Sequence, residues 1–433
     1  MMMVSSKIYL NQLKELNDLN EIGKQMGVDL PLINLNSKDL VFNEGKLIEL
    51  NNEIRKKWRA KVGTFIAPEY KSTLWGTNVK DLQGFKYHFS YETLLNDEND
   101  FADLLGYEIQ GMKRKTFLFS SGMAAISHMF YCFSSFLKNN LIVQSSIGYF
   151  ETKYFLKVLA SMGNIVKFDF RSNLNANLFY FEPIKYDATL SLTDIDVVLR
   201  RINESDAKIK FVIMDSTMHN RTKIFDHLID KIQNVKNVIF CDIRSGLKLD
   251  QEGLELSNLG VSTIFVSKSN VQLIEAIRRY IEQYKSLTGA NLSFYSLILN
   301  HYFFRNCNSI TYTKRIGQQV MWAGNLLRQN SSSNIKSVVY RKTNYCGEIL
   351  IAPFIFIELN TKRESDYLSA IKLFQKKMDS IGSPIDYRNS WGFRFPSIEY
   401  FNDIFSHQKY IKYYPGAFKG LTASNAIRVF NEL

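Results

Sequence analysis

The chain has 433 residues, of which 45% are hydrophobic and 22% are charged. These proportions are typical of a globular protein with an ample core and exclude a largely disordered chain. No apolar run reaches the ~18 residues that a membrane-spanning helix needs, and the first residues carry charges throughout, unlike a secretory signal. The net charge of +12 comes from scattered lysines and arginines, so we expect small anionic ligands and no nucleic acid or membrane partner.

The cysteines and histidines indicate neither disulfides nor a metal site. Cys132, Cys241, Cys307 and Cys346 lie far apart in the sequence, mostly beside apolar residues. Buried free thiols in a reducing compartment, the cytoplasm, are therefore the prediction. The six histidines form no pair at the spacing of metal ligands, so we expect no metal.

Three parts of the chain differ in their patterns. Residues 1–110 form a divergent N-terminal segment with helical stretches at 8–26 and 45–61. Residues 111–295 alternate short β-rich runs with helical runs, which predicts a large α/β domain with a mainly parallel, doubly wound sheet. Residues 296–433 combine strands near 349–359 with a helix at 364–380, which predicts a smaller α+β domain.

The expected elements of the large domain alternate in chain order, and sheets of this kind bind ligands at the carboxyl ends of their strands. The six strands are expected at 116–119, 141–144, 165–169, 209–214, 237–241 and 263–266. The helices between them are expected at 123–137, 150–161, 193–203, 223–234 and 248–259.

The first of these strands ends in the stretch "KTFLFSSGMAAISHMF", where an apolar run breaks at Ser120, Ser121 and Gly122. From Met123 onward the apolar residues recur at the spacing of a helix. A strand that turns directly into a helix leaves unpaired backbone N–H groups at the helix start. Together with the helix dipole, these groups predict an anion-binding turn, although an ordinary structural turn would give the same pattern.

Chemically active side chains follow the later strands in turn. Each has a plain alternative, such as packing for an aromatic ring, a helix cap for an aspartate or solvation for a lysine. Their order and spacing favour a shared cleft, because about one βα unit separates Asp215 from Asp242 and Asp242 from Lys268. They are Tyr149 after the second strand, Asp215, His219 and Asn220 after the fourth, Asp242 after the fifth, and Ser267 and Lys268 after the sixth.

This ordered set resembles the fold-type-I enzymes that depend on pyridoxal 5′-phosphate (PLP), with the aspartate aminotransferase-like fold. Within them it resembles the cystathionine γ-synthase, or Cys-Met metabolism, family of transsulfuration enzymes. "SSGMAAI" resembles the phosphate-binding turn of that family, "YFETKYFL" its Tyr-Gly-Gly-Thr-Tyr-Arg-Leu-Phe, and "YKSLTGANLS" its Thr-Gly-x-x-Leu-Ser. "DSTMHN" stands in place of the family's Glu-Ser-Pro-x-Asn-Pro, and "DIRS" in place of its Asp-Asn-Thr. The likeness covers 115–295 well and 385–433 loosely.

The resemblance implies a cofactor site for PLP. Ser121, Gly122 and Met123 would bind its phosphate, and Tyr149 would stack on its ring. His219 or Asn220 would lie near its 3′ oxygen.

The resemblance also implies the groups that act on the cofactor. Asp242 would pair with the ring nitrogen, and Lys268, preceded by Ser267, would bind the cofactor covalently and move protons. Lys248, six residues after Asp242, is the alternative lysine.

Two segments near the end of the chain supply the expected substrate-binding residues. "AIRVFNEL" resembles the closing Ile-Arg-Leu-Ser-x-Gly-x-Glu of the family, which would place Arg428 on the substrate carboxylate. An internal ion pair of Arg428 is the alternative. "SWGFRFPS" resembles the Ser-Leu-Gly loop beside the substrate, which makes Ser390 and the competing Arg394 candidates as well.

Two departures from the family pattern affect the substrate side. Phe150 and Glu151 replace its double glycine. Its Tyr-x-Arg, which reaches into a neighbouring subunit, appears at best as Tyr87-His88-Phe89. We therefore expect a cytoplasmic PLP-dependent lyase or transferase, a homodimer or homotetramer. It would act on an amino acid by β- or γ-elimination or replacement. An aminotransferase, a decarboxylase or a non-catalytic relic that serves as a binding protein are the alternatives.

Overall fold

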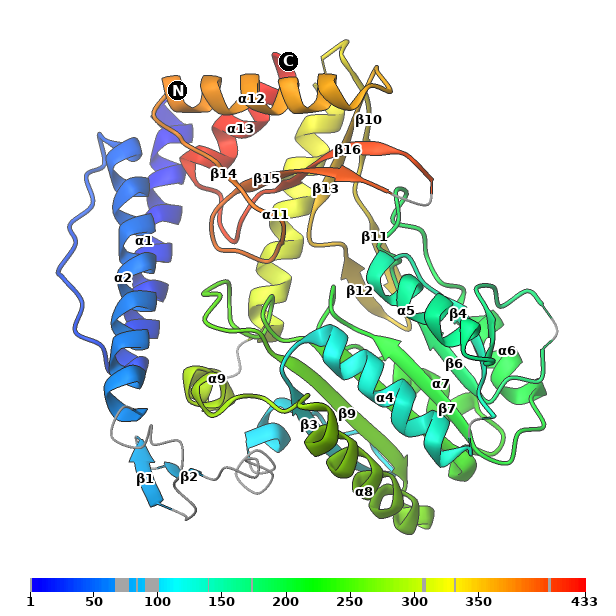
Figure 1. Ribbon diagram of the computed structural model, residues 1–433. Helices are drawn as coiled ribbons and strands as arrows, with labels where there is room; N and C mark the ends of the chain where they lie inside the picture. Colours follow the sequence, from blue (N-terminus) through cyan, green and yellow to red (C-terminus); the bar gives the residue numbers. More distant parts are fainter. Residues whose placement is uncertain are drawn as a thin grey trace.

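The computed structural model describes residues 2–66, 78–82, 85–89, 101–138, 140–172, 174–305, 309–330, 332–403 and 406–433. Two long helices, α1 (Met2–Met26) and α2 (Leu40–Ile66), lie side by side along one flank of the molecule (Figure 1). Their apolar faces bury Leu19, Leu47 and Trp58, and the Trp58 indole donates to the carbonyl of Leu299 at 2.9 Å. The predicted helices at 8–26 and 45–61 lie within them.

A short antiparallel hairpin follows α2. It consists of β1 (Asn78–Leu82) and β2 (Phe85–Phe89). The Tyr87-His88-Phe89 segment lies in β2, and its side chains lie outside the described part of the structure.

The large sheet has seven strands in the order β3-β9-β8-β7-β6-β4-β5. Six of them run in the same direction, and β9 runs against both of its neighbours. The strands are β3 (Met112–Phe119), β4 (Ile142–Ser146), β5 (Ile165–Lys167), β6 (Leu178–Phe181), β7 (Lys210–Asp215), β8 (Val238–Ser245) and β9 (Gly260–Ser267). All six predicted strands are present, and β6 was missed.

Helices cover both faces of this sheet, as predicted for a doubly wound fold (Figure 1). One face packs on α4 (Gly122–Phe136), α5 (Phe150–Ser161) and α8 (Val271–Thr288). The other packs on α6 (Ile195–Glu204) and α7 (Ile224–Lys231).

The predicted helix at 248–259 is wrong, and this error changes the topology. The segment forms turns, and Glu252, Gly253 and Glu255 take positive φ angles of 47°, 76° and 47°. Left-handed residues cannot continue a right-handed helix. Without a helical crossover the chain returns antiparallel to β8, so β9 runs opposite to the predicted direction.

The C-terminal part is built around a second, five-stranded sheet in the order β10-β13-β16-β15-β14. Its strands are β10 (Ile335–Val339), β13 (Ile355–Leu359), β14 (Asp386–Tyr387), β15 (Ser397–Asn402) and β16 (Lys409–Tyr414). The helices α11 (Ser309–Gln329), α12 (Glu364–Ser380) and α13 (Leu421–Asn431) pack on this sheet. The short helices α9 (Phe294–Leu299) and α10 (His301–Arg305) pack in one cluster with α2 instead, and β11 (Lys342–Tyr345) forms a hairpin with β12 (Glu348–Ile351). The predicted helix at 364–380 is α12. The "AIRVFNEL" run is not a strand, because it forms the end of α13.

The two ends of the described chain are joined by buried carboxylates. Glu44 on α2 accepts hydrogen bonds from the backbone N–H groups of Leu421 (2.5 Å) and Thr422 (3.0 Å), which begin α13. Glu15 on α1 accepts from Nε of Arg394 at 2.6 Å, with both side chains buried. The α1–α2 pair is thereby fixed to the C-terminal part.

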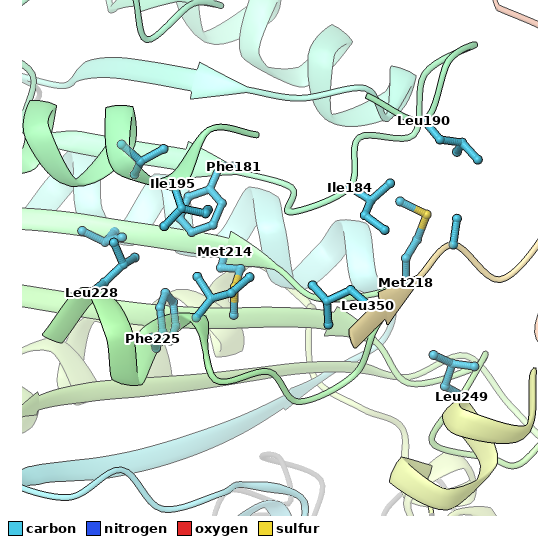
Figure 2. Close-up of a cluster of buried hydrophobic side chains, with 14 of the residues drawn as sticks. Phe181, Ile184, Leu190, Ile195, Met214, Met218, Phe225, Leu228, Leu249 and Leu350 are labelled. Carbon is cyan, nitrogen blue, oxygen red and sulfur yellow. The ribbon is translucent and has the colours of Figure 1, made fainter. Parts of the chain in front are cut away.

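A large cluster of buried apolar side chains fills the space beneath the sheet on the α6–α7 side (Figure 2). Phe181 and Met214 come from neighbouring strands, and Phe225 and Leu228 from α7. The cluster continues through Met218 to Leu350 on β12, so it joins the large sheet to the C-terminal part.

Cys132 and Cys241 are buried free thiols, as predicted, whereas Cys346 is free but exposed, contrary to prediction. Cys307 lies outside the described residues. Within the described ranges, no helix is long and apolar enough to cross a bilayer. Nor do His, Cys, Asp and Glu gather there in a group of three that could hold a metal ion.

Candidate active site

A cavity of about 800 Å³ opens at the carboxyl ends of the parallel strands. This is the edge at which sheets of this type bind ligands. Side chains from the ends of β3, β4, β7 and β8 line one side, and residues 387–401 of the C-terminal part line the other. The cavity therefore lies between the large sheet and the C-terminal part.

The first wall of the cavity is the predicted anion-binding turn. Ser121 caps α4, and its Oγ accepts from the N–H of Ala124 at 3.0 Å. The N–H groups of Gly122 and Met123 begin the helix, where intrahelical bonding leaves such groups open. A Cβ at Gly122 would lie 3.0 Å from Cβ of Ser245, so a glycine is needed for this close approach. Ser245, the last residue of β8, adds a hydroxyl group beside the turn.

Tyr149 supplies an aromatic wall, as predicted. It is the N-cap residue of α5, and its ring meets that of Tyr186 edge to face at 5.6 Å. Its hydroxyl donates to Glu151 at 2.8 Å. Glu182 accepts from the backbone N–H groups of Gly148 and Tyr149 at 3.2 and 3.0 Å, which fixes the turn that carries the ring.

Asp215 is one of two buried carboxylates among the described residues that line the cavity, and Glu182 is the other. Asp215 ends β7, and it accepts hydrogen bonds from the N–H of Thr217 at 2.9 Å and from the hydroxyl of Tyr180 at 3.2 Å. Burial raises its pKa, while these hydrogen bonds and the charge of Lys248 act in the opposite direction. A cationic ligand atom beside it would favour the ionised form.

Of the described residues that line this cavity, Lys248 is the only one with a positively charged side chain. Its Nζ donates to Oγ of Ser390 at 3.3 Å and lies 5.2 Å from the centre of the Trp391 ring. Burial lowers its pKa below the ordinary 10.5, while the charges of Asp215 and Glu151 oppose that shift. A lowered pKa increases the fraction of neutral amine, which is the nucleophilic form.

The prediction that Lys268 lies in this cleft is wrong. Because β9 is antiparallel to β3, Ser267 pairs with Met112 at the start of β3, while Gly260 pairs with Phe119 at its end. The eight residues of β9 span about 25 Å, so Lys268 lies at the opposite edge of the sheet. There it is exposed, and its N–H donates to the carbonyl of Gly111 at 3.1 Å. The alternative lysine, Lys248, is the one in the cavity.

Asp242 does not lie in the cavity either. Side chains alternate along β8, and Ile243 and Ser245 point into the cavity, so Asp242 and Arg244 face the other side of the sheet. There the carboxyl of Asp242 lies near Tyr107. Burial raises its pKa to about 6, against the charge of Arg244.

His219 and Asn220 are buried directly after the cavity loop, but neither lines this cavity. The prediction that one of them adjoins a cofactor there is therefore wrong. His219 lines a second cavity instead.

The structure places one of the three predicted substrate-binding residues in the cavity and the other two outside it. Ser390 lines the cavity and contacts Lys248. Arg428 lies exposed on α13, within the helical layer of the small sheet. Arg394 is buried in its ion pair with Glu15, and its Nη1 donates to the carbonyl of Glu252 at 3.1 Å. Neither arginine is among the lining residues.

Two charged groups that line the cavity, Glu182 and Glu399, were not anticipated from the sequence. Glu399 lines the cavity and binds Nζ of Lys412 at 2.8 Å, and Tyr414 donates to Glu399 at 2.6 Å. Lys412 also donates to the hydroxyl of Tyr186, and burial lowers its pKa to about 8. A lysine within the apolar strand pattern "YIKYYP" is the signal that would have indicated this buried pair.

Many solved structures are similar to this chain, and two of them match it over most of both chains. CalE6, a methionine gamma lyase from Micromonospora echinospora, is 13% identical with a TM-score of 0.56, covering 83% of this chain and 93% of that chain. A serine palmitoyltransferase from Sphingomonas wittichii is 10% identical with a TM-score of 0.50, covering 86% of this chain and 82% of that chain. No protein-family model and no curated protein matches the sequence. The likeness is one of fold, and it confirms the predicted fold-type-I α/β architecture with a smaller C-terminal α+β part.

Proposed function

We propose that this chain is a PLP-dependent enzyme that acts on an amino acid. The observation that supports this most strongly is the meeting of Lys248, Asp215 and the start of α4 in one cavity. A lysine, a buried carboxylate and an anion-binding turn are the groups that PLP requires. Sequence resemblance implied the cofactor, and the fold shared with the two solved structures agrees with it.

The residues present fit the cofactor. The N–H groups of Gly122 and Met123, with the hydroxyl of Ser245, would bind the phosphate. The ring of Tyr149 would lie against the pyridine, and Asp215 would pair with the ring nitrogen. Lys248 would hold the cofactor covalently. When bound, PLP withdraws electrons from the carbon that bears the substrate's amino group.

The chain's own groups would then position the substrate and move its protons. Burial lowers the pKa of Lys248, which increases the fraction of neutral Nζ, the form that can accept a proton from a neighbouring carbon. The hydroxyl of Ser390 directs that Nζ by accepting its hydrogen bond. Asp215 would supply the negative charge that pairs with the ring nitrogen of the cofactor.

The reaction that we propose is β- or γ-elimination or replacement, with cysteine, cystathionine or an O-acylhomoserine as candidate substrates. The resemblance of the sequence to the cystathionine γ-synthase family supports it. One of the two structures that share the fold is named as a methionine gamma lyase.

Reduction of the PLP-loaded protein with borohydride, followed by peptide mapping, tests the cofactor assignment. We expect one labelled lysine, Lys248, and we expect Lys268→Ala to be labelled as the wild type is. Incubation with cysteine, cystathionine and O-acylhomoserines, with assays for the released 2-oxo acid and thiol, tests the reaction. Absence of any PLP adduct would contradict the proposed cofactor, and release of no product from any of these substrates would contradict the proposed reaction.

A further inference from the structure

A second cavity, of about 880 Å³, lies between α11, the β11–β12 hairpin and the loop that follows β7. It is distinct from the candidate active site, and a common wall separates the two. Met218 lines the first cavity, Leu350 lines the second, and both side chains belong to one buried cluster (Figure 2).

The inner wall of the second cavity is apolar. Ile310 and Met321 come from α11, and Ile349, Leu350 and Ile351 come from β12. Ile310 and Ile349 are exposed large hydrophobic side chains, at 43% and 56% of their full area. A ligand with an apolar body would remove this surface from water, which is favourable.

The rim of the cavity is strongly cationic. Of the described residues that line this cavity, Glu348 is the only one with an acidic side chain. It accepts a hydrogen bond from the backbone N–H of Lys223 at 2.8 Å. None of Lys223, Lys314 and Lys342 forms an ion pair within the described part of the chain. A concave surface with this excess of positive charge attracts anions. The cationic lining residues are Arg221, Lys223, Lys314, Lys342 and Lys419.

A buried histidine gives the cavity a polar group without a partner. His219 is only 5% exposed, and neither of its ring nitrogens has a hydrogen-bond partner. Burial lowers its pKa to about 3, so the ring is neutral and offers one donor and one acceptor. An unsatisfied buried polar group costs free energy. Because His219 lines the cavity, a ligand there can supply the missing hydrogen bond.

We propose that this second cavity binds an amphipathic organic anion. Its apolar body would rest on the wall formed by α11 and β12, and its anionic head would meet Lys314 and Lys342. A polar atom of the ligand would form a hydrogen bond with His219. The site requires no chemistry of the first cavity and does not depend on the proposed reaction.

Isothermal titration calorimetry of the PLP-loaded full chain with naphthyl phosphate tests this site. Naphthyl phosphate carries both features, whereas inorganic phosphate lacks the apolar body. We expect one saturable naphthyl phosphate site per chain and binding of inorganic phosphate weaker by about tenfold or more. The double variant Lys314→Glu, Lys342→Glu should weaken naphthyl phosphate by about tenfold or more, because it reverses the charge that the head meets.

Lys208→Glu is the matched control, since Lys208 is exposed and lines neither cavity; it should bind naphthyl phosphate as the wild type does. His219→Leu keeps a buried apolar side chain but loses both nitrogens, and it should weaken naphthyl phosphate while the lysine rim stays intact. Circular dichroism verifies that each variant is folded. The proposal is overturned if naphthyl phosphate does not bind, or if its affinity is the same in the lysine double variant.

Discussion

The two edges of the large sheet carry similar sequence motifs but offer very different surroundings. At the carboxyl edge, Ser245 ends β8 and Lys248 lies three residues further on, and both side chains line the cavity that also contains Asp215. At the opposite edge, Ser267 and Lys268 follow β9, and Lys268 is exposed. In each case a serine ends a strand and a lysine follows. What distinguishes them is the direction of the strand, so strand direction, and not the local motif, decides which lysine can do chemistry.

The largest effect is expected from exchanging the two lysines in turn for alanine. Lys248→Ala should lower turnover by on the order of 10³-fold or more, because the nucleophile and proton carrier are the same group. Lys268→Ala should leave turnover unchanged. Steady-state kinetics with each variant measures this. If Lys268→Ala lost more activity than Lys248→Ala, the assignment of Lys248 as the catalytic lysine would be wrong.

The contrast between motif and placement also applies to two arginines of the C-terminal part. Arg394→Ala removes one of the two arginines that bind the buried carboxylate of Glu15, while Arg315 remains bound at 2.6 Å, so the free energy of unfolding should fall by about 1.5–3 kcal/mol, the loss of a hydrogen bond to a charged group. Arg428→Ala removes an exposed side chain and should change it by less than about 0.5 kcal/mol. Urea denaturation measures both. Equal stability of the two variants, with a raised KM in Arg428→Ala, would restore Arg428 as a substrate residue.

A comparison of Asp215 and Asp242 tests whether an aspartate must face the cavity side of the sheet to support catalysis. Asp215→Asn should lower turnover by ~10²- to 10³-fold, because a neutral amide no longer places negative charge beside the cofactor. Asp242→Asn, on the other face of β8, should keep most of the activity. The kinetics should be measured with saturating PLP, so that a loss of cofactor is not mistaken for a loss of chemistry. Full turnover in Asp215→Asn would contradict the role of that carboxylate.

The smallest effect concerns the pH dependence of stability. The pKa of Asp242 is raised from 3.8 to about 6 in the folded chain. Between these values the unfolded chain has released the proton that the folded chain still holds, so this group lowers stability as the pH rises through this window. The free energy of unfolding of Asp242→Asn, relative to that of the wild type, should therefore rise between pH 3.8 and about 6 and stay constant at higher pH. Thermal melting of both proteins across this range measures the difference, and parallel curves would exclude the effect.

Local patterns in the sequence were enough to predict the doubly wound sheet, the turn from strand to helix at Ser121 to Met123 and the placement of Tyr149 in the cavity. These depend on periodicity and on residues adjacent to a strand end. The placement of Ser390 came instead from the resemblance to a known family. The direction of β9 was missed because the apolar residues of 248–259 mimic a helix, while the left-handed conformations at Glu252 and Glu255 are not evident from residue type. One such error moved the expected lysine across the sheet.

Arg394 was wrongly expected to bind substrate for another reason. Its partner is set by a tertiary contact with no local signal, since Glu15 lies 379 residues from Arg394. Likewise, the pairing of Lys412 with Glu399 depends on two adjacent strands of the small sheet.

The carboxylates of Glu15 and Glu44 bear on the order in which the chain folds. Residues Glu44 and Leu421 are 377 positions apart, and Glu15 and Arg394 are 379 apart. Contacts at such separation form late, because the entropy of closing a long loop must be overcome first. During synthesis, α1 and α2 leave the ribosome long before their partners exist. The indole of Trp58 lacks its acceptor until Leu299 has been made, and Glu44 lacks the start of α13 until the last segment emerges, so the nascent chain depends on protection from aggregation in the meantime.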